Sequence, residues 1–399
     1  TRYVALALKA RICLYEGTFR KYRANDPSTG KPWTADEAET YLRAAVSACN
    51  ELMTSKKYSL VSDPANVSTQ YRKLFTSESV FTQEVIWARV YNAELNATHN
   101  LNSNFIVQQY GSYSLTKQFI NTYLNLDGSR FTDKPGYEKT AFIDEFENRD
   151  YRLMQTVRYP GYTRKNNGTD TRYAPDFSYC VTGYQPIKWV IDDTSLDSNT
   201  SPCSTSIPII RYAEILLTYA EAKCELDEFD ETVWNETIKP LRERAGVDGT
   251  MPATADPYMI EYFLGTVTDN ALLEIRRERG CELILENVRW DDDMRWGMGK
   301  LAERPWYGVY VGELDKAYDM DGDGKDDVCF VRKEPERPQA GITYRVLGDD
   351  FSLTDGDSGY IECYIRMTRK WDDKKYVRPI PTTALNDNPA LGQNYGWEK

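Results

Sequence analysis

Apolar residues recur at helical spacing from the N-terminus to about residue 300. Residues 1–17 predict a first helix, whose large side chains share one stripe beside small alanines: Val4, Leu8 and Ile12. Residues 34–55 predict a second helix, because Thr34 can cap its first turn and Glu37 completes a capping box. Since a chain seldom begins inside a buried helix, we expect the sequence to be part of a longer protein.

Three later segments continue the helical pattern. Residues 207–226 give the strongest helix, in which Pro208 suits the first turn and apolar residues cover most of the circumference. A single polar stripe interrupts them, formed by Arg211, Glu214, Thr218, Glu221 and Glu225. Residues 230–248 predict a helix that breaks or kinks near Pro240, and residues 270–297 follow. These paired helices favour tetratricopeptide-like repeats, although no regular period is visible.

The pattern is weaker elsewhere. Residues 79–91 alternate only in part, so helix and strand both stay open, whereas residues 114–124 predict a short helix. Helical signals fade from residue 302, and residues 302–375 are expected to be irregular and rich in insertions. In the last segment, residues 376–399, three prolines argue against a regular helix. Its large apolar side chains argue equally against a disordered tail.

Composition narrows the function classes. The chain has 399 residues, of which 41% are hydrophobic and 28% charged, as in a globular protein. No apolar run approaches the roughly 20 residues that a membrane span needs. The net charge of −12 argues against a nucleic-acid partner, because phosphate binding requires a basic surface. The 29 tyrosines and 9 tryptophans supply rigid rings for a core or for stacking on a ligand.

Motifs of catalysis and redox chemistry are absent from the sequence. A single histidine, His99, excludes a two-histidine zinc site, and neither a GxSxG elbow nor a P-loop occurs. The eight cysteines contain no CxxC pair, and we expect no disulfide. With 61 acidic residues, carboxylate pairs arise by chance, so a glycosidase pair stays open on sequence grounds. We expect no enzyme and no organic cofactor, and His99 is expected to lie in a solvated loop.

One acidic loop has the spacing of a calcium ligand set. Its carboxylates alternate along the chain as in an EF-hand loop, at Asp319, Asp321, Asp323 and Asp327. Gly324 permits the tight turn, and Lys325 would offer its backbone carbonyl. Phe330 stands where an EF-hand has its bidentate glutamate, so that ligand would have to come from elsewhere. We expect a structural Ca²⁺, and the alternative is a solvated acidic turn.

Five segments, in the same order, resemble the SusD/RagB family of outer-membrane lipoproteins of Bacteroidetes. They are ALALKARICLYEG (5–17), FENRDYRLMQTVRYPGY (146–162), IIRYAEILLTYAEA (209–222), IRRERGCELILENVRWDDDMRWG (275–297) and RPIPTTALNDNPALGQNYGW (378–397). Gly280–Cys281 and Glu286–Asn287 depart from the residues common in the family's arginine-rich helix. The match spans nearly the whole chain.

The resemblance implies a fold and a role. The fold would be mostly α, with tetratricopeptide-like helix pairs and large irregular loop insertions, in one domain (1–399) that lacks its N-terminal part. Residues 376–399 would form a C-terminal extended strap along the outside of the helical body, with Trp397 as its anchor. Such proteins sit at the extracellular face of the outer membrane, held by a lipid anchor that would belong to a segment outside this chain. There they cover a SusC-like TonB-dependent transporter and capture oligosaccharides or, alternatively, peptides or other nutrients.

The residues that would hold a glycan are predicted from aromatic loops, since the five family segments are expected to be scaffold. Sugars stack on aromatic rings and accept hydrogen bonds from polar side chains. Residues 159–189 are loop-like and carry Tyr159, Tyr162, Tyr173, Tyr179 and Tyr184. Residues 303–314 carry Trp306, Tyr307 and Tyr310. For each ring the alternative role is packing against the helical body.

Overall fold

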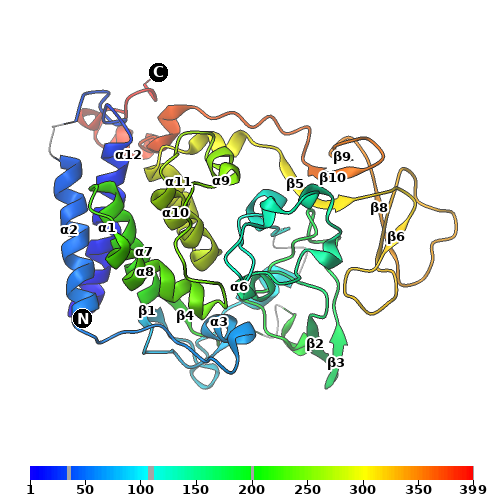
Figure 1. Ribbon diagram of the computed structural model, residues 1–399. Coiled ribbons are helices and arrows are strands. Elements are labelled where there is room, and N and C mark those ends of the chain that lie inside the picture. Colours follow the sequence, from blue (N-terminus) through cyan, green and yellow to red (C-terminus); the bar gives the residue numbers. More distant parts are fainter. Residues whose placement is uncertain (34–36, 107–111, 199–201, 399) are drawn as a thin grey trace.

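The computed structural model describes residues 1–33, 37–106, 112–198 and 202–398. Its helical half contains two long helices and four shorter ones that lie side by side in Figure 1: α1 (Arg2–Lys21), α2 (Glu37–Thr54), α7 (Tyr212–Glu225), α8 (Glu231–Arg244), α10 (Asn270–Leu283) and α11 (Arg289–Arg295). α1 packs on α2, α2 on α7, and α7 on both α8 and α10. The expected helix pairs are therefore present. The capping box at Thr34 lies outside the described residues.

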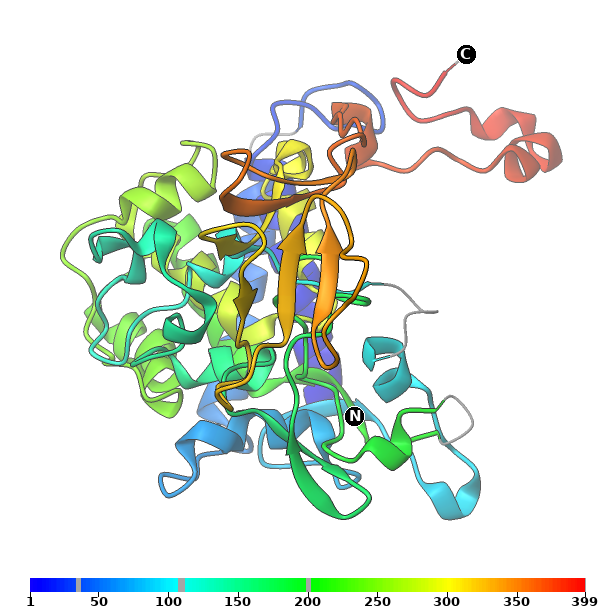
Figure 2. The ribbon, with the colours of Figure 1, turned by 90° about the vertical axis from the view of Figure 1, so that its right-hand side faces the viewer.

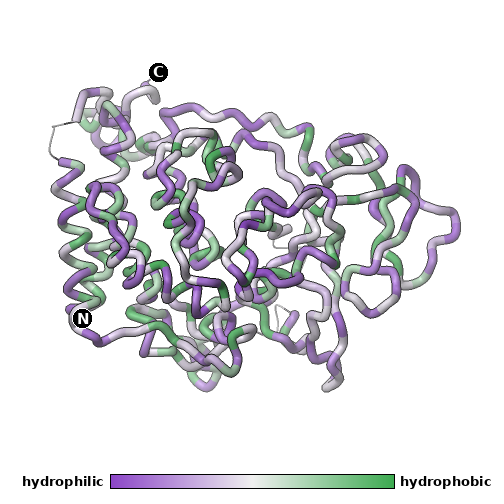
Figure 3. The backbone as a smooth tube through the Cα atoms, viewed as in Figure 1, coloured by the Kyte–Doolittle hydropathy of each residue, from purple (hydrophilic) through white to green (hydrophobic). Residues whose placement is uncertain are grey.

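Small residues let α1 and α2 approach closely. Ala7 and Ala10 of α1 and Ala45 of α2 are fully buried, and a Cβ at Gly17 would lie 2.8 Å from Leu42 Cγ. Along both helices polar and apolar residues alternate in Figure 3, as expected of amphipathic helices with one inward face. The inward face differs from the predicted one, because the side chain of Ile12 is 51% exposed.

The segment 207–226 departs from its predicted form, since it starts as a strand. β4 (Ile207–Arg211) pairs antiparallel with β1 (Val85–Arg89), and Pro208 lies opposite Ala88. The isoleucines favour a strand, and proline is tolerated on the edge of such a small sheet. The helix begins only at Tyr212. α8, by contrast, runs through Pro240 without the predicted break.

The polar stripe of α7 faces inward and is buried. Glu214 pairs with Arg11 of α1 at 2.6 Å, and Glu225 pairs with Lys21 at 2.9 Å. Glu221 accepts a 2.7 Å hydrogen bond from Arg295 Nη2. These ion pairs explain how α7 packs on several sides although its stripe is charged, because buried charges require such partners.

The other half of the protein is built from loops, short helices and short strands. The helices are α3 (Val67–Thr76), α4 (Leu101–Ile106), α5 (Lys117–Ile120), α6 (Tyr151–Thr156) and α9 (Pro257–Tyr262). Two three-stranded sheets face the viewer in Figure 2, in the orders β5-β10-β9 and β6-β7-β8. The mostly helical fold is thus confirmed only in part. Among the described residues no helix is both long and apolar enough to cross a membrane.

The strands of this half are short. The first sheet comprises β5 (Trp306–Val311), β9 (Phe351–Leu353) and β10 (Gly359–Cys363). The second comprises β6 (Ala317–Tyr318), β7 (Val328–Val331) and β8 (Thr343–Val346), while β2 (Thr163–Asn166) and β3 (Thr169–Arg172) form a hairpin. Buried side chains of β5, β7, β9 and β10 join one core cluster. The fading of helical signals after residue 302 therefore marks a β-rich region.

The C-terminal strap differs from the predicted extended segment. It contains a short helix, α12 (Thr382–Asp387), which fits between Pro381 before it and Pro389 after it. The strap projects from the helical body in Figure 2, and the side chain of Tyr395 is 59% exposed. Trp397 Nε1 donates to the carbonyls of Lys374 and Val377, at 2.9 and 3.1 Å. Trp397 therefore fastens the strap to its own base rather than to the helices.

Candidate functional site

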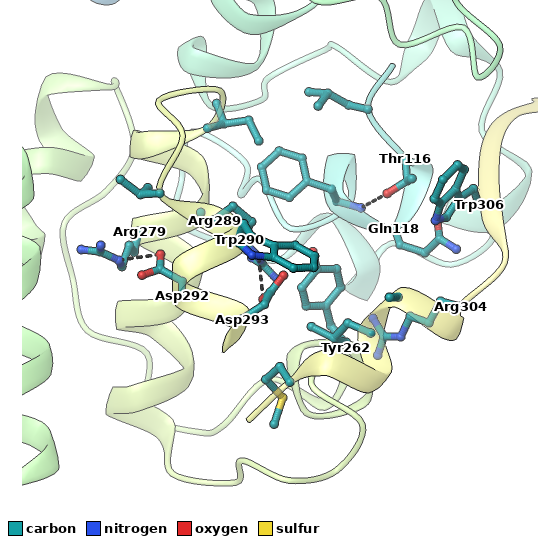
Figure 4. A pocket seen from close by; sticks show the side chains of 18 of the residues that line it. Thr116, Gln118, Tyr262, Arg279, Arg289, Trp290, Asp292, Asp293, Arg304 and Trp306 are labelled. Atoms are coloured by element: carbon teal, nitrogen blue, oxygen red, sulfur yellow. Dashed lines mark hydrogen bonds and ion pairs between the residues drawn. The ribbon is translucent and has the colours of Figure 1, made fainter. Parts of the chain in front are cut away.

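A cleft of about 350 Å³ lies between the arginine-rich helices and the loop half of the protein. Figure 4 shows its lining, which comes from α5, α9, α10, α11 and the segment that leads into β5. It therefore sits where residues remote in sequence meet. Clefts of this size with aromatic walls are the usual sites of small-molecule binding.

Three aromatic rings line the cleft. Trp290 of α11 is 55% exposed, which is unusual for a tryptophan in a helix. Tyr262 of α9 and Trp306 of β5 are partly exposed. Trp306 is held in place by Tyr364, with ring centroids 5.7 Å apart, and by the Arg369 guanidinium, 4.7 Å from its ring. The rings therefore offer apolar faces on several sides of one space.

Polar groups stand between the rings. Arg304 lies 5.1 Å from the centroid of the Tyr262 ring and donates to the Glu261 carbonyl at 2.7 Å. Gln118 Nε2 donates to the Pro305 carbonyl at 2.9 Å. Arg289 Nε pairs with Asp293 Oδ1 at 2.9 Å. Such fixed donors and acceptors can orient a polyhydroxylated ligand that the rings hold by stacking.

The carboxylates of the cleft are engaged by arginines. Asp292 accepts a 2.7 Å hydrogen bond from Arg279 Nε, and Asp293 pairs with Arg289. Burial raises the pKa of Asp293, although Arg289 opposes the shift. Both acids therefore have structural partners within the fold. This arrangement suits ligand binding better than acid–base catalysis, which needs a carboxyl group directed at the reacting bond.

The tyrosines predicted in residues 159–189 do not line this cleft. Tyr162 and Tyr184 are core residues, with 2% and 0% exposure. Each can be buried because its hydroxyl donates a hydrogen bond to a carboxylate. Tyr162 donates to Asp192 at 2.5 Å, and Tyr184 donates to Glu145 at 2.8 Å. Tyr159, Tyr173 and Tyr179 are partly exposed. Tyr162 and Tyr184 therefore pack in the core, which was the alternative to ligand binding for these two rings.

Sequence reasoning found one ring of the cleft and missed two. Trp306 was predicted and lies in the cleft, while Tyr307, its neighbour, faces the outer side of the β5–β10 sheet. Trp290 and Tyr262 were missed, and Trp290 belongs to a segment interpreted as scaffold.

The acidic loop brings three of its predicted ligands together. Carboxylate oxygens of Asp319, Asp321 and Asp327 lie within 4.8 Å of one another. Asp323 instead pairs with Lys325 Nζ at 2.9 Å. Gly324 has the predicted tight-turn conformation, with φ +85°. The donor set is one of hard oxygens and so fits Ca²⁺.

The pKa values of this loop reflect the crowding of its acids. Burial and the neighbouring carboxylates Asp321 and Asp319 raise the pKa of Asp327 to about 6. Burial raises the pKa of Asp321 as well, and the neighbouring carboxylates Asp323 and Asp319 add to the shift. A cation between these oxygens would relieve the repulsion.

His99 also departs from its expected solvated position. Its Nε2 lies 2.8 Å from the Thr205 carbonyl, and its Nδ1 lies 3.3 Å from Cys203 Sγ. The ring is thus part of a junction between two loop segments, and His99 is not among the residues that line the cleft.

Together, the fold and the cleft define a candidate binding site carried by a helical scaffold. The SusD family model matches residues 83–397, and the chain therefore belongs to the SusD family. No curated protein sequence matches the chain.

Several solved structures share the fold. One is a SusD-like protein from Bacteroides fragilis NCTC 9343, at 18% identity and a TM-score of 0.62, covering 100% of this chain and 65% of that one. Another, from the same strain, is a SusD-like carbohydrate binding protein, at 20% identity and a TM-score of 0.58. The match covers 98% of this chain and 64% of that one. A SusD superfamily protein from Parabacteroides distasonis ATCC 8503 matches at 17% identity and a TM-score of 0.50, and the match covers 100% of this chain and 63% of that one. This chain thus spans less than two thirds of their length, and the likeness at such identities is one of fold.

Proposed function

We propose that the protein captures an oligosaccharide in the cleft at Trp290. The observation that carries this proposal is the grouping of Trp290, Tyr262 and Trp306 around one space, with fixed polar groups between them. Sugar rings need both kinds of contact, since their CH faces stack on aromatic rings and their hydroxyls hydrogen-bond. Membership of the SusD family supports the same class of ligand.

The proposal extends to the partner and the location. The protein would act at the extracellular face of the outer membrane and deliver its ligand to a SusC-like TonB-dependent transporter. It would be held there by a lipid anchor, and it would bind its ligand without converting it. The engagement of Asp292 and Asp293 by arginines supports binding without catalysis.

A peptide is the second candidate ligand. The charged groups in the cleft, Arg304 and the Arg289–Asp293 pair, favour it, because they match the charged termini and side chains of peptides. The salt dependence of binding distinguishes an oligosaccharide ligand from a peptide ligand. Binding of a neutral oligosaccharide should change little with ionic strength, whereas binding of a charged peptide should weaken as salt rises.

Calorimetric titration tests the proposal. The wild-type protein and the Trp290→Ala variant are titrated with panels of neutral oligosaccharides and of peptides at two salt concentrations. We expect Trp290→Ala to raise the Kd about tenfold, the change that the loss of an aromatic contact produces. The control is Trp87→Ala, which removes an exposed tryptophan of β1 outside the cleft. Equal effects of both substitutions would contradict the assignment of the cleft.

We also propose that Asp319, Asp321 and Asp327 hold one structural Ca²⁺. The convergence of their oxygens supports this, and so does the fit of a hard cation to carboxylate ligands. The ion would close the loop against the hairpin, since Arg172 of β3 donates to the carbonyls of Asp321 and Gly322.

A further inference from the structure

β5 and β10 pair with each other (Figure 1), and tyrosines from both strands meet on one face of the pair. The Tyr360 ring of β10 stacks on Tyr307 of β5 at a centroid distance of 5.8 Å, with 23° between the planes. Tyr310 meets the same ring edge-on, at 6.0 Å and 81°. These partly exposed rings contrast with Val309 and Val311 of β5, which are buried in the core.

A register shift explains how two residues of β5 reach the same ring. Side chains of a strand alternate between faces, so Tyr307 and Tyr310 would point to opposite sides of a regular strand. The pairing shifts between Tyr360, opposite Tyr310, and Glu362, opposite Tyr307. The extra residue turns both tyrosines outward. Gly308 permits this bulge, because a Cβ there would lie 2.7 Å from the Cα of Thr182.

Two further tyrosines extend this surface. The rings of Tyr137 and Tyr258 meet edge-to-face at 6.3 Å, and both are partly exposed. Gln118 joins this pair to β5, because it hydrogen-bonds to both Tyr258 and Tyr307. We call these five residues the tyrosine ledge: Tyr137, Tyr258, Tyr307, Tyr310 and Tyr360.

The ledge continues from the cleft through Gln118. This residue lines the cleft, and its backbone carbonyl accepts a 2.9 Å hydrogen bond from the Tyr258 hydroxyl. Its side-chain Oε1 accepts a 3.4 Å hydrogen bond from the Tyr307 backbone N–H. Trp306 of the cleft precedes Tyr307 of the ledge in β5. The ledge therefore adjoins the cleft at Gln118.

We propose that the tyrosine ledge is a second carbohydrate subsite, which holds the distal units of an oligosaccharide whose first units occupy the cleft. The proposal rests on the proposed function. The chemistry of the ledge favours a sugar chain over an apolar protein partner, because each ring carries a hydroxyl and Glu362, two residues after Tyr360 in β10, lies on the same face. From Tyr307 to Tyr310 the strand advances by about 10 Å, so the ledge accepts more than one ring.

A length series tests this subsite. The trimers and hexamers of malto-, cello-, xylo- and manno-oligosaccharides are titrated into the wild type and into Tyr310→Ala, Tyr310→Phe and Trp290→Ala variants. The control is Tyr395→Ala, which removes an exposed tyrosine of the strap. Thermal unfolding of each variant verifies that it is folded.

We expect the best hexamer to bind at least several-fold more tightly than its trimer. Tyr310→Ala should raise the Kd of the hexamer about twofold to tenfold without changing that of the trimer, and Tyr310→Phe should keep most of the affinity because the ring remains. Equal affinity of trimer and hexamer, with no effect of Tyr310→Ala, would overturn the ledge and leave the cleft assignment intact. If Trp290→Ala and Tyr310→Ala both bind as tightly as the wild type, or if no probe binds at all, the ledge and the cleft assignments are both overturned.

Discussion

At the scale of single residues, the buried arginines determine how the helices can pack. Arg211 reaches three carboxylates that come from different segments, with Glu84 at 2.6 Å, Glu282 at 2.9 Å and Glu286 at 2.6 Å. Each of these charges is costly in the interior unless its partners are present. The ion pairs therefore make the packing of α7, α10 and α11 dependent on a specific set of residues.

The pair Glu221–Arg295 gives a testable case. Arg295→Met leaves Glu221 buried without its main partner, and we expect the free energy of unfolding to fall by about 3–5 kcal/mol. Urea unfolding measures this change. The matched control is Arg43→Met, which breaks exposed ion pairs with Glu39 and Glu228 and should leave the free energy of unfolding nearly unchanged. Similar losses in both variants would contradict the argument.

The same pair has a pH signature. Burial alone would raise the pKa of Glu221, but the Arg295 guanidinium lowers it to about 2. A carboxyl whose folded pKa is lowered stabilises the protein above its unfolded value, near 4.5. The contribution of Glu221 should therefore be complete above about pH 5 and disappear as the pH falls towards 2. In Arg295→Met this part of the acid transition should be absent.

At the scale of elements, the sequence predicts those parts whose signal is local. The helices α1, α2, α10 and α11 follow from apolar periodicity, which needs no remote partner. The start of α7 was missed because residues 207–211 become a strand only by pairing with β1, more than a hundred residues earlier. The same holds for the site. Tyr162 and Tyr184 can be buried because their hydroxyls donate hydrogen bonds to Asp192 and Glu145. The sequence alone does not show which carboxylate each tyrosine will meet.

The acidic loop is the element whose behaviour should depend most on ions and pH. Without a cation, the raised pKa of Asp327, about 6, means that stability falls as the pH rises from about 4 to 6, because the folded state holds the proton more tightly than the unfolded state. With Ca²⁺ the trend should reverse, since the ion binds the deprotonated carboxylates. The increase of Tm on adding calcium should therefore be larger at pH 7.5 than at pH 5.

Scanning calorimetry with calcium or with chelator at both pH values measures this difference. Asp321→Asn should remove the effect of calcium, whereas Asp357→Asn, at an exposed acid outside the loop, should keep it. If chelator leaves the Tm of the wild type unchanged at pH 7.5, the loop is only an acidic turn.

At the scale of the whole molecule, the cleft lies where α10 and α11 of the helical half meet the loop half, and three of the five ledge tyrosines belong to β5 and β10 of the loop half. The strap is held as a closed loop, since Gln393 exchanges hydrogen bonds with the backbone of Ile380 at 2.7 and 3.0 Å. No residue among 376–398 lines the cleft, although the base of the strap lies near it, because Trp371 contacts both Tyr376 and Trp290. A protein that hands its ligand to a transporter needs such a separation, because the surface that contacts the partner must stay in place while the ligand leaves.

This separation leads to a prediction about the partner. The affinity-tagged full-length protein, solubilised from the outer membrane of its host in mild detergent, should co-purify with a large β-barrel protein of the TonB-dependent class. Trp290→Ala should retain the barrel although it binds less ligand, because the cleft is not expected to form the contact with the transporter. An unrelated tagged lipoprotein of the same membrane serves as the control. Recovery of the tagged protein alone, or loss of the barrel in Trp290→Ala, would show that the cleft and the partner surface are not arranged as proposed.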